Sequence, residues 1–303
     1  MEPSILREAI PSSYLVRSWR NFNTLIETEM PLEELNQALE HSRPSLDELI
    51  LEWKTNLESY LISALPEQLT DSQEGDISGS RNDASKQASS IIPECIIALG
   101  NNSEIQSFSG LSSDTQRLLR ANCVFIYNGL VKYYPDDFHG WHLTETCVAY
   151  DPSVAKIANA LLASLRLPNV PYLRLKAVGN AFVCGRCTCN RRMTWKETMQ
   201  HYVDEENKYA SVQTSPHVLS ITYIHTHDVS VSKPYKPLLN VIDTKTPQIW
   251  GRYRVSYQEC LMCEHLGVTF EHQPDVVSNH LRDVHLIESP KLNEHYRRGL
   301  GGP

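Results

Sequence analysis

Apolar residues recur every three or four positions from Ser13 to about Leu69, which is the spacing of a helix with one apolar face. Pro44-Ser45 predicts a helix break and an N-cap, and Pro66 predicts the end of the helix that follows. The apolar positions of that helix are Leu46, Leu49, Ile50, Trp53, Leu57, Tyr60 and Leu61. We expect this face to pack on the rest of the protein.

Residues 70–90 break the pattern, because they consist largely of Ser, Asp, Gly, Asn and Gln. Ile77 is almost the only apolar residue among them. A segment of this composition buries too little apolar surface to offset the entropy lost on ordering. The sequence therefore predicts a helical region at 1–69 followed by a flexible linker at 70–90.

Helical signals return after the linker. Ile91–Leu99 is a short apolar run, and Ser112/Ser113-Asp114 predicts the start of a helix that contains Leu118, Leu119, Val124 and Ile126. The segment 151–165 opens with Asp-Pro and continues with alanines and apolar residues at helical spacing, so it is the clearest predicted helix. We expect a second helical region at 91–181.

Short runs of β-branched and aromatic residues follow that helix. We predict strands at Tyr172–Val178, Val218–Tyr223 and Gly251–Tyr257. The chain as a whole is therefore expected to be α+β, with a helical N-terminal region followed by a mixed region. The mixed region, at 182–303, is expected to contain small elements of the zinc-knuckle type.

A paired-ligand motif lies near the end of the chain. Cys260 and Cys263 (CLMC) precede His280 and His285 (HLRDVH), in a segment where Pro274 predicts a helix start. Two thiolates and two imidazoles can close a tetrahedron around Zn²⁺, with bonds of roughly 2.0–2.3 Å. Sixteen residues separate the two pairs, more than the roughly twelve of a DNA-reading finger. We predict a structural zinc site. The alternatives are a catalytic zinc site, and two thiols and two histidines that have this spacing by chance.

A second candidate metal site lies upstream. Cys184 and Cys187 (CGRC) precede His201, on a helix expected to open at Thr194-Trp195, and His227 (HTHD) is the first choice for the fourth ligand. Alternatives for single positions stay open: Cys189 for a thiol, His225 or His217 for an imidazole, and Asp228 as a carboxylate that orients one. A redox CxxC is disfavoured, because the motif does not open a thioredoxin-like βαβ unit. One or two structural zinc ions are the expected cofactor.

Cysteine usage and the pattern of apolar residues indicate the cellular compartment of the protein. Five of the eight cysteines lie in the two motifs, which indicates metal binding in a reducing compartment, and Cys95, Cys123 and Cys147 are expected to be buried apolar residues. No leader and no apolar run of about 20 residues is present. We expect a cytoplasmic or nuclear protein with no membrane partner.

The charge pattern disfavours nucleic acid as a partner. Residues 1–181 hold 14 Lys and Arg against 23 Asp and Glu, whereas residues 182–303 hold 14 against 13. Phosphate binding needs clustered positive charge, which neither part has. If the terminal motif did bind nucleic acid, Asn279, Arg282 and Lys291 would be the helix residues in contact.

Enzymatic motifs are also missing from the sequence. It contains no His-Glu-x-x-His, no nucleophile elbow and no recognisable pair of catalytic carboxylates. We therefore expect a protein that is not an enzyme. A metallohydrolase, suggested only by the surplus histidines, is the least favoured alternative.

Four stretches carry a resemblance to known proteins: residues 43–67, residues 114–126, FVCGRCTCNRRMTWKETMQHY at 182–202, and the terminal CLMC with VVSNHLRDVH. Through them the chain resembles a family of fungal, mostly basidiomycete, F-box or F-box-like proteins with zinc-finger-like tails. We recognise no F-box, with its Leu-Pro-x-Glu-like opening, in the first forty residues. The resemblance implies a substrate-receptor-like role in ubiquitin ligation, for which another partner would have to supply the ligase contact. We expect a non-enzymatic, zinc-stabilised protein-interaction module with an unidentified protein partner.

Overall fold

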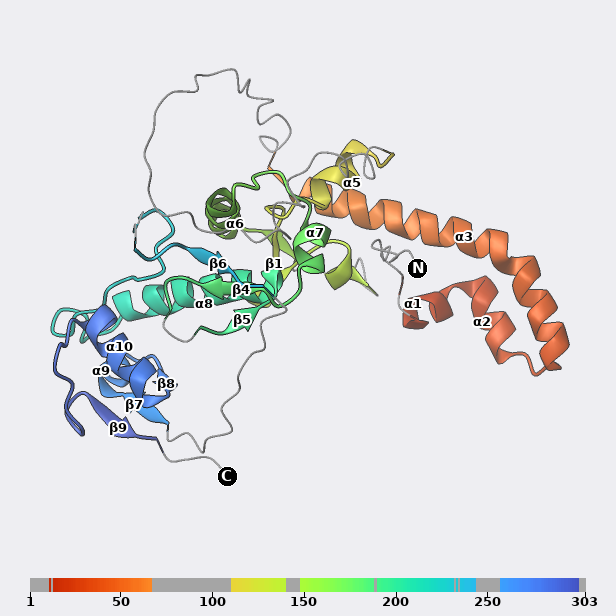
Figure 1. Ribbon diagram of the computed structural model, residues 1–303. Coiled ribbons are helices and arrows are strands. Elements are labelled where there is room, and N and C mark those ends of the chain that lie inside the picture. The colour runs from red at the N-terminus through yellow and green to blue at the C-terminus, as the bar shows by residue number, and fades with distance from the viewer. Residues whose placement is uncertain are drawn as a thin grey trace, which may run out of the picture. The chain divides into compact units, whose positions relative to one another are not determined.

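The computed structural model describes residues 11, 13–66, 110–139, 148–187, 190–231, 233, 235–243 and 257–299. Within these ranges the protein combines helices with small antiparallel sheets, so the predicted α+β class is confirmed (Figure 1). The chain divides into two compact units, 1–155 with 169–177 and 156–168 with 178–303. In the described part of the chain, no helix is both long and apolar enough to cross a membrane. The predicted linker at 70–90 lies outside the described residues.

Three helices begin the first unit: α1 (Ser13–Ser18), α2 (Arg20–Glu27) and α3 (Leu32–Ser63). The predicted break at Pro44-Ser45 is wrong, because α3 continues through Pro44. A proline inside a helix removes one backbone hydrogen bond and can kink the helix without ending it, and helix-forming leucines and glutamates lie on both sides. The end of α3 at Ser63 agrees with the stop predicted near Pro66.

The C-terminal half of α3 packs into the core of the first unit. Its buried residues follow one face at four-residue spacing: Trp53, Leu57 and Leu61. Glu58, on the next position, accepts hydrogen bonds from the hydroxyls of Thr115 and Tyr134. The residue before the first turn of α3 is Pro31.

A helix followed by a β-hairpin replaces the single helix predicted after Ser112. Ser112 does cap α5 (Ser113–Leu118), accepting a hydrogen bond from the Thr115 amide, but the chain then enters β1 (Phe125–Tyr127). Val124 and Ile126 are therefore not helical. Asn128 and Gly129 adopt positive φ of 50° and 75° and form the two-residue turn to β2 (Leu130–Lys132). β3 (Ala149–Tyr150) completes an antiparallel sheet in the order β2-β1-β3.

The strand predicted at Tyr172–Val178 is wrong, because these residues form α7 (Tyr172–Ala177). Packing explains the helix: the Tyr172 ring stacks on Tyr133 at 4.1 Å, and its hydroxyl donates to Asp136 in the 3₁₀ helix η3 (Asp136–Phe138). β-propensity is weak against such tertiary contacts. By contrast, the helix predicted at 151–165 is confirmed as α6 (Pro152–Leu165), capped by the Asp151 carboxylate.

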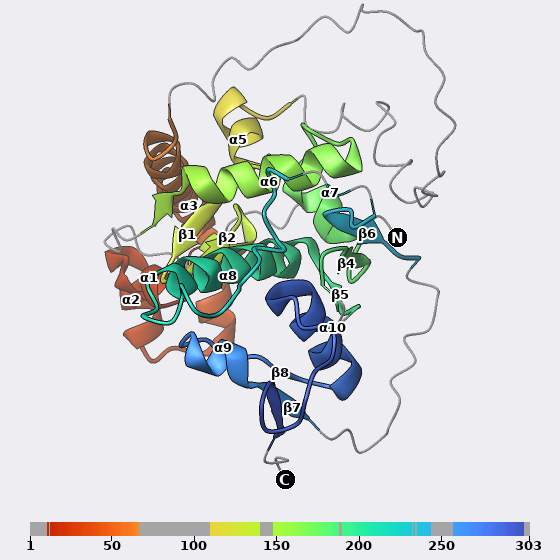
Figure 2. The same cartoon turned by 90° about the vertical axis from the view of Figure 1, so that its left-hand side faces the viewer.

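The second unit contains a sheet in the order β5-β4-β6, formed by β4 (Phe182–Cys184), β5 (Arg192–Met193) and β6 (Leu239–Val241). Helix α8 (Trp195–Gln213) lies beside β4 and β5 (Figure 2). Thr194 and Glu197 form a capping box at its start, which confirms the predicted opening. Its buried apolar face consists of Trp195, Met199, Tyr202 and Val203.

Another small sheet, β8-β7-β9, lies nearer the C-terminus: β7 (Gln258–Cys260), β8 (Glu271–His272) and β9 (Tyr296–Arg298). Between its strands run α9 (Leu261–His265) and α10 (Pro274–His285), which begins at Pro274 as predicted. The buried core here is small: Cys260, Cys263, Val277 and Leu281.

The last two predicted strands have different outcomes. Val218–Tyr223 is not a strand; the amides of Ser220 and Ile221 instead bond back to the His217 carbonyl in a turn. Residues 251–256 of the other segment lie outside the described residues, as do Cys95 and Cys147. Cys123 is buried, as expected.

The core face of α3 yields the first prediction. Leu57 is 0% exposed and Leu51, on the same helix, is 64% exposed. We expect Leu57→Ala to lower the free energy of unfolding by about 2–5 kcal/mol, because it removes buried methyl groups and leaves a cavity. Leu51→Ala is the matched control and should change it by no more than about 0.5 kcal/mol. Urea unfolding of both variants measures this; equal losses would contradict the assigned core face.

Candidate metal centres

The first candidate centre is the C-terminal cluster, which we define as Cys260, Cys263, His280 and His285. Cys260 ends β7 and caps α9, Cys263 lies in α9, and both histidines project from α10. All four side chains are buried. The Cys263 Sγ lies 3.1 Å from Nε2 of His280 and 3.4 Å from Nε2 of His285. The structure thus brings together the four residues predicted from the motif.

The imidazoles of the C-terminal cluster are held in the form that binds metal. Nδ1 of His285 lies 2.7 Å from the Thr222 carbonyl oxygen, which can only accept, so Nδ1 carries the proton and the Nε2 lone pair faces the thiols. The His280 ring stacks on Phe270 at 3.7 Å. Burial lowers the pKa of His280, which favours the neutral ring.

The pKa values of the two thiols in the same cluster shift in opposite directions: contact with Cys260 raises the pKa of Cys263, whereas that of Cys260 is lowered. The Cys263 amide donates to the Cys260 Sγ at 3.4 Å. Contact with the Cys263 thiol, followed by contacts with His280 and His285, lowers the pKa of Cys260. The thiolate is the form that ligates metal, so the surroundings of Cys260 stabilise the state a cation requires.

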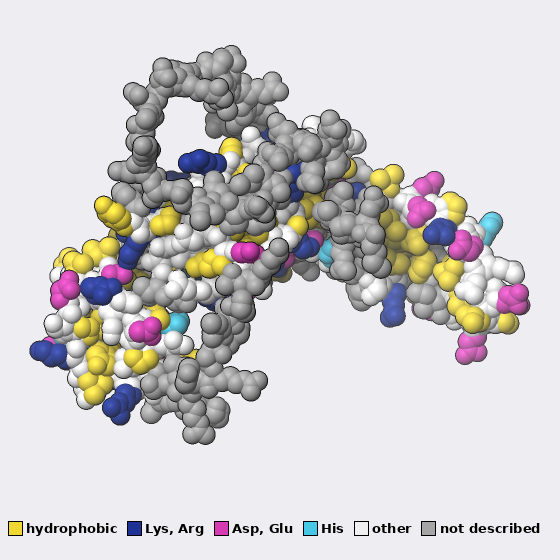
Figure 3. Space-filling view, in the orientation of Figure 1, with side chains coloured by type: hydrophobic (Ala, Val, Ile, Leu, Met, Phe, Trp, Pro, Cys, Tyr) yellow, Lys and Arg dark blue, Asp and Glu magenta, His cyan; other side chains and the backbone are white. Residues whose placement is uncertain are grey.

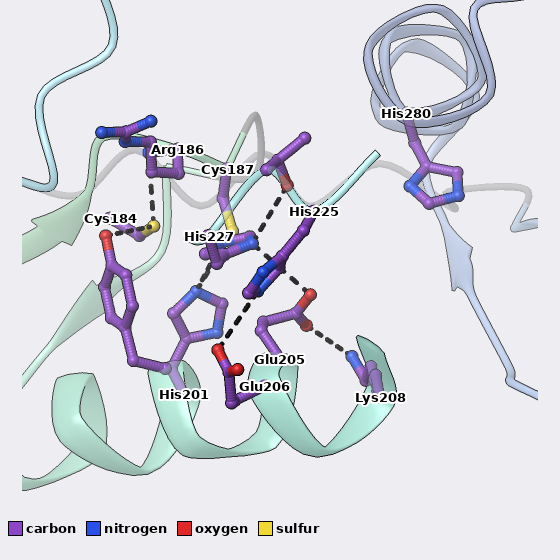
Figure 4. Close-up of polar contacts among 12 residues, drawn as sticks. Cys184, Arg186, Cys187, His201, Glu205, Glu206, Lys208, His225, His227 and His280 are labelled. Atoms are coloured by element: carbon purple, nitrogen blue, oxygen red, sulfur yellow. Dashed lines mark hydrogen bonds and ion pairs between the residues drawn. The ribbon is translucent and has the colours of Figure 1, made fainter. Parts of the chain in front are cut away.

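The second candidate centre is the upstream cluster, which we define as Cys184, Cys187, His201 and His227 (Figure 4). Cys184 ends β4, Cys187 follows in the turn, and His201 lies on α8. The Cys187 Sγ is 3.2 Å from Nε2 of His201 and 3.1 Å from Nε2 of His227, and the two nitrogens are 3.2 Å apart. The motif residues and the first-choice fourth residue therefore meet.

The turn between the two upstream cysteines has little room to vary. Gly185 donates its amide to the Leu238 carbonyl, and a Cβ at this position would clash with the Pro237 carbonyl. The next amide, of Arg186, donates to the Cys184 Sγ at 3.3 Å. Contact with the Cys187 thiol is the largest of several effects that lower the pKa of Cys184. The glycine of CGRC thus allows the close backbone approach that aims both sulfurs inward.

Both clusters have the dimensions of a tetrahedral metal site. Bonds of about 2.0 Å to nitrogen and about 2.3 Å to sulfur give tetrahedron edges of roughly 3.3–3.8 Å. The sulfur–nitrogen and nitrogen–nitrogen distances are 3.1–3.4 Å, which extends from slightly below this range to its short end. Two thiols with two imidazoles are the donor set that Zn²⁺ prefers. The residues present therefore fit a zinc ion in each cluster.

The alternative ligands weighed from the sequence lie elsewhere. His225 stacks on Tyr209 at 4.2 Å and lies 3.3 Å from a Glu206 carboxylate oxygen, outside the upstream cluster (Figure 4). His217 instead has its ring 6.5 Å from that of His265. Cys189 lies outside the described residues. Of the candidate histidines, His227 alone joins the upstream cluster in the part of the chain that the structure describes.

Asp228 does not orient an imidazole as we expected. Its carboxylate accepts hydrogen bonds from the amide and hydroxyl of Ser230, which closes a local turn. Glu205 takes the expected position instead, with Oε2 3.6 Å from Nδ1 of His227, while Thr226 Oγ1 lies 3.1 Å from the same nitrogen. Glu205 follows His201 by four residues on α8, so helical spacing is the signal that could have identified it.

Glu205 is an ionised carboxylate inside the unit. Burial raises its pKa, but electrostatic interactions with His227 and Lys208 outweigh this, so the pKa of Glu205 is lowered. Its Oε1 lies 2.6 Å from Nζ of Lys208. A carboxylate beside Nδ1 orients the ring and makes Nε2 a stronger ligand.

Comparison with known proteins adds no family. No protein-family model matches the chain, and no curated protein and no solved structure matches it. The resemblance noted in the sequence therefore stays a prediction, and the functional argument depends on the geometry of the two clusters.

The position of Glu205 yields the second prediction. We expect Glu205→Gln to weaken zinc binding at the upstream cluster by about 10-fold or more, because the ring of His227 loses its carboxylate. Glu206→Gln is the matched control, since Glu206 pairs with His225 outside the cluster. Competition against a chromophoric chelator measures both affinities. Equal affinities for the two variants would refute the orienting role of Glu205.

Proposed function

We propose that the chain is a non-enzymatic protein-interaction module whose second unit is held together by two structural zinc ions. One observation carries this proposal: eight residues form two groups of two cysteines and two histidines, and the ligand atoms of each group lie within 4.8 Å of one another. Two thiols and two imidazoles that converge in this way are the donor set of a tetrahedral Zn²⁺ site.

The ligand sets support a structural role for the metal over a catalytic one. Catalytic zinc sites usually have three protein ligands and keep a fourth position for water, whereas each cluster offers four. All four ligands of the C-terminal cluster are buried, as is usual for a closed structural site. The metallohydrolase alternative has no supporting observation in the described residues.

The small cores of the second unit explain why metal would be needed. Sheets of two- and three-residue strands bury little apolar surface. The C-terminal core has four buried residues, and two of them are the cysteines of the cluster, Cys260 and Cys263. Structural zinc contributes about 10–16 kcal/mol in small zinc-finger peptides, an amount comparable to the stability of a whole domain. Metal binding and folding of this unit would then be one process.

Surface charge supports a protein partner more than a nucleic acid. In Figure 3, Lys and Arg side chains lie singly over the visible face, with Asp and Glu between them. Of the three residues considered as contacts, Arg282 lies beside Asp283 and Asn279, and Lys291 beside Glu294. Lys291 also lies beyond the end of α10, so the expectation that it belongs to the helix is wrong. A substrate-receptor role rests on the resemblance alone.

Zinc content gives the third prediction. We expect two zinc ions per purified chain by elemental analysis. Cys184→Ser and Cys260→Ala should each retain one ion with zinc in excess, because each variant breaks one ligand set. Cys189→Ser and His225→Ala are the controls and should retain two. A wild-type chain with no zinc, or a Cys189→Ser chain with one, would contradict the assigned ligand sets.

The interaction role gives the fourth prediction. We expect quantitative affinity capture to recover a set of partner proteins with the wild-type chain and to lose them with Cys260→Ala, which disrupts the C-terminal cluster. Cys189→Ser is the control and should capture the same set as the wild type. Identical capture by the wild type and Cys260→Ala would contradict the proposal, as would a metal-bound water that exchanges with added anions in the cobalt-substituted protein.

A further inference from the structure

The two clusters are joined by a short stretch of chain, Thr222–His227, which we call the bridging segment. It forms no helix or strand, so its position depends on contacts at its two ends. At its start, the Thr222 carbonyl accepts the hydrogen bond from Nδ1 of His285 at 2.7 Å. Two residues later, the Ile224 amide donates to the Val284 carbonyl at 2.9 Å. The start of the bridging segment is therefore fixed by the end of α10 and by a member of the C-terminal cluster.

The far end of the bridging segment belongs to the upstream cluster. Its last residue, His227, lies 3.1 Å from the Cys187 Sγ through Nε2, and the preceding Thr226 hydroxyl contacts Nδ1 of the same ring at 3.1 Å. Only four residues thus lie between Thr222, whose carbonyl is held by one cluster, and His227, whose imidazole belongs to the other. A stretch this short transmits the position of one end to the other, because few conformations join the two ends.

Tyr223, the second residue of the bridging segment, packs against residues near both clusters. Its ring centroid lies 5.6 Å from that of His285, and it packs on the apolar core beside the C-terminal cluster. On the other side its ring is 6.3 Å from that of Tyr209 on α8, the helix that also supplies His201. Tyr223 therefore contacts His285 of the C-terminal cluster directly. Through Tyr209 it also contacts α8, the helix that carries His201 of the upstream cluster.

Further contacts tie the same two regions. Lys236, beyond the bridging segment, lies 2.6 Å from the Asp283 carboxylate on α10. A cavity of about 150 Å³ lies between the clusters, and its lining includes His227 and Cys187 from one and His280 and Cys263 from the other. The two clusters thus face a common space, and neither is packed independently of the other.

We propose that the bridging segment makes the two metal sites cooperative, so that an ion in either cluster raises the affinity of the other. The inference rests on the proposed zinc sites. With the C-terminal cluster empty, α10 and His285 lose the ligand bonds that fix them, and the bridging segment loses its anchor. Metal binding at the upstream cluster must then also order His227, and the conformational entropy lost in doing so weakens the binding. Because coupling between two sites is reciprocal, an ion in either cluster must raise the zinc affinity of the other cluster by the same factor.

The experiment compares zinc affinities of single clusters. The affinity of the upstream cluster is measured by chelator competition in the wild type and in Cys260→Ser, and that of the C-terminal cluster in the wild type and in Cys184→Ser. Cobalt spectra identify which cluster is loaded. We expect each remaining cluster to bind about 5- to 150-fold more weakly than in the wild type, with the same factor for both.

Tyr223→Ala tests the bridging segment without removing a ligand. In the Tyr223→Ala protein we expect two zinc ions still to bind. Adding Cys260→Ser or Cys184→Ser to it should then weaken zinc binding at the remaining cluster by a factor close to one. Tyr235→Ala is the matched control, because Tyr235 is 98% exposed, and should leave the factor unchanged. An unchanged factor in Tyr223→Ala would refute the role of the segment.

The outcomes separate this inference from the proposed function. If the wild type binds two zinc ions and each remaining cluster keeps its wild-type affinity in the single variants, the sites are independent and only the cooperativity is overturned. If the wild type binds no zinc, the proposed function and the inference both fall.

Discussion

The second unit depends on one constraint: buried thiols and imidazoles must be given polar partners. The ligand atoms come from β4, the turn after it, α8 and the bridging segment for one cluster, and from β7, α9 and α10 for the other. Away from water, these groups cost free energy unless each is hydrogen-bonded or bound to a cation. Their convergence at 3.1–3.4 Å satisfies that requirement locally and determines where the surrounding elements lie.

Helix α8 serves the upstream cluster through several residues at helical spacing. His201 enters the cluster, Glu205 lies one turn later beside His227, and Lys208 pairs with Glu205. Tyr209 stacks on His225 and keeps that ring outside the cluster. The capping box at Thr194 fixes the start of the helix, so one well-formed element positions a ligand, its neighbouring carboxylate and the aromatic support of the bridging segment.

The errors of the sequence interpretation have distinct physical causes. Apolar spacing predicts a helix that contains Val124 and Ile126, whereas the Asn128-Gly129 turn is the stronger local signal and forms the hairpin at 125–132. For α7, a run of strand-forming residues was overruled by stacking and hydrogen bonding of Tyr172. Pro44-Ser45 predicts a helix break, although a proline can lie within a long helix that its neighbours favour.

The sequence by itself determined the local parts of this protein. The CxxC spacings, the capping residues Thr194 and Asp151, and the start of α10 at Pro274 all act over three or four residues, and such signals can be read without a fold. The tertiary structure alone decided which distant groups meet. His227 was one of three candidate histidines, and Glu205 replaced Asp228, because which side chain reaches a cluster depends on how segments far apart in the chain pack.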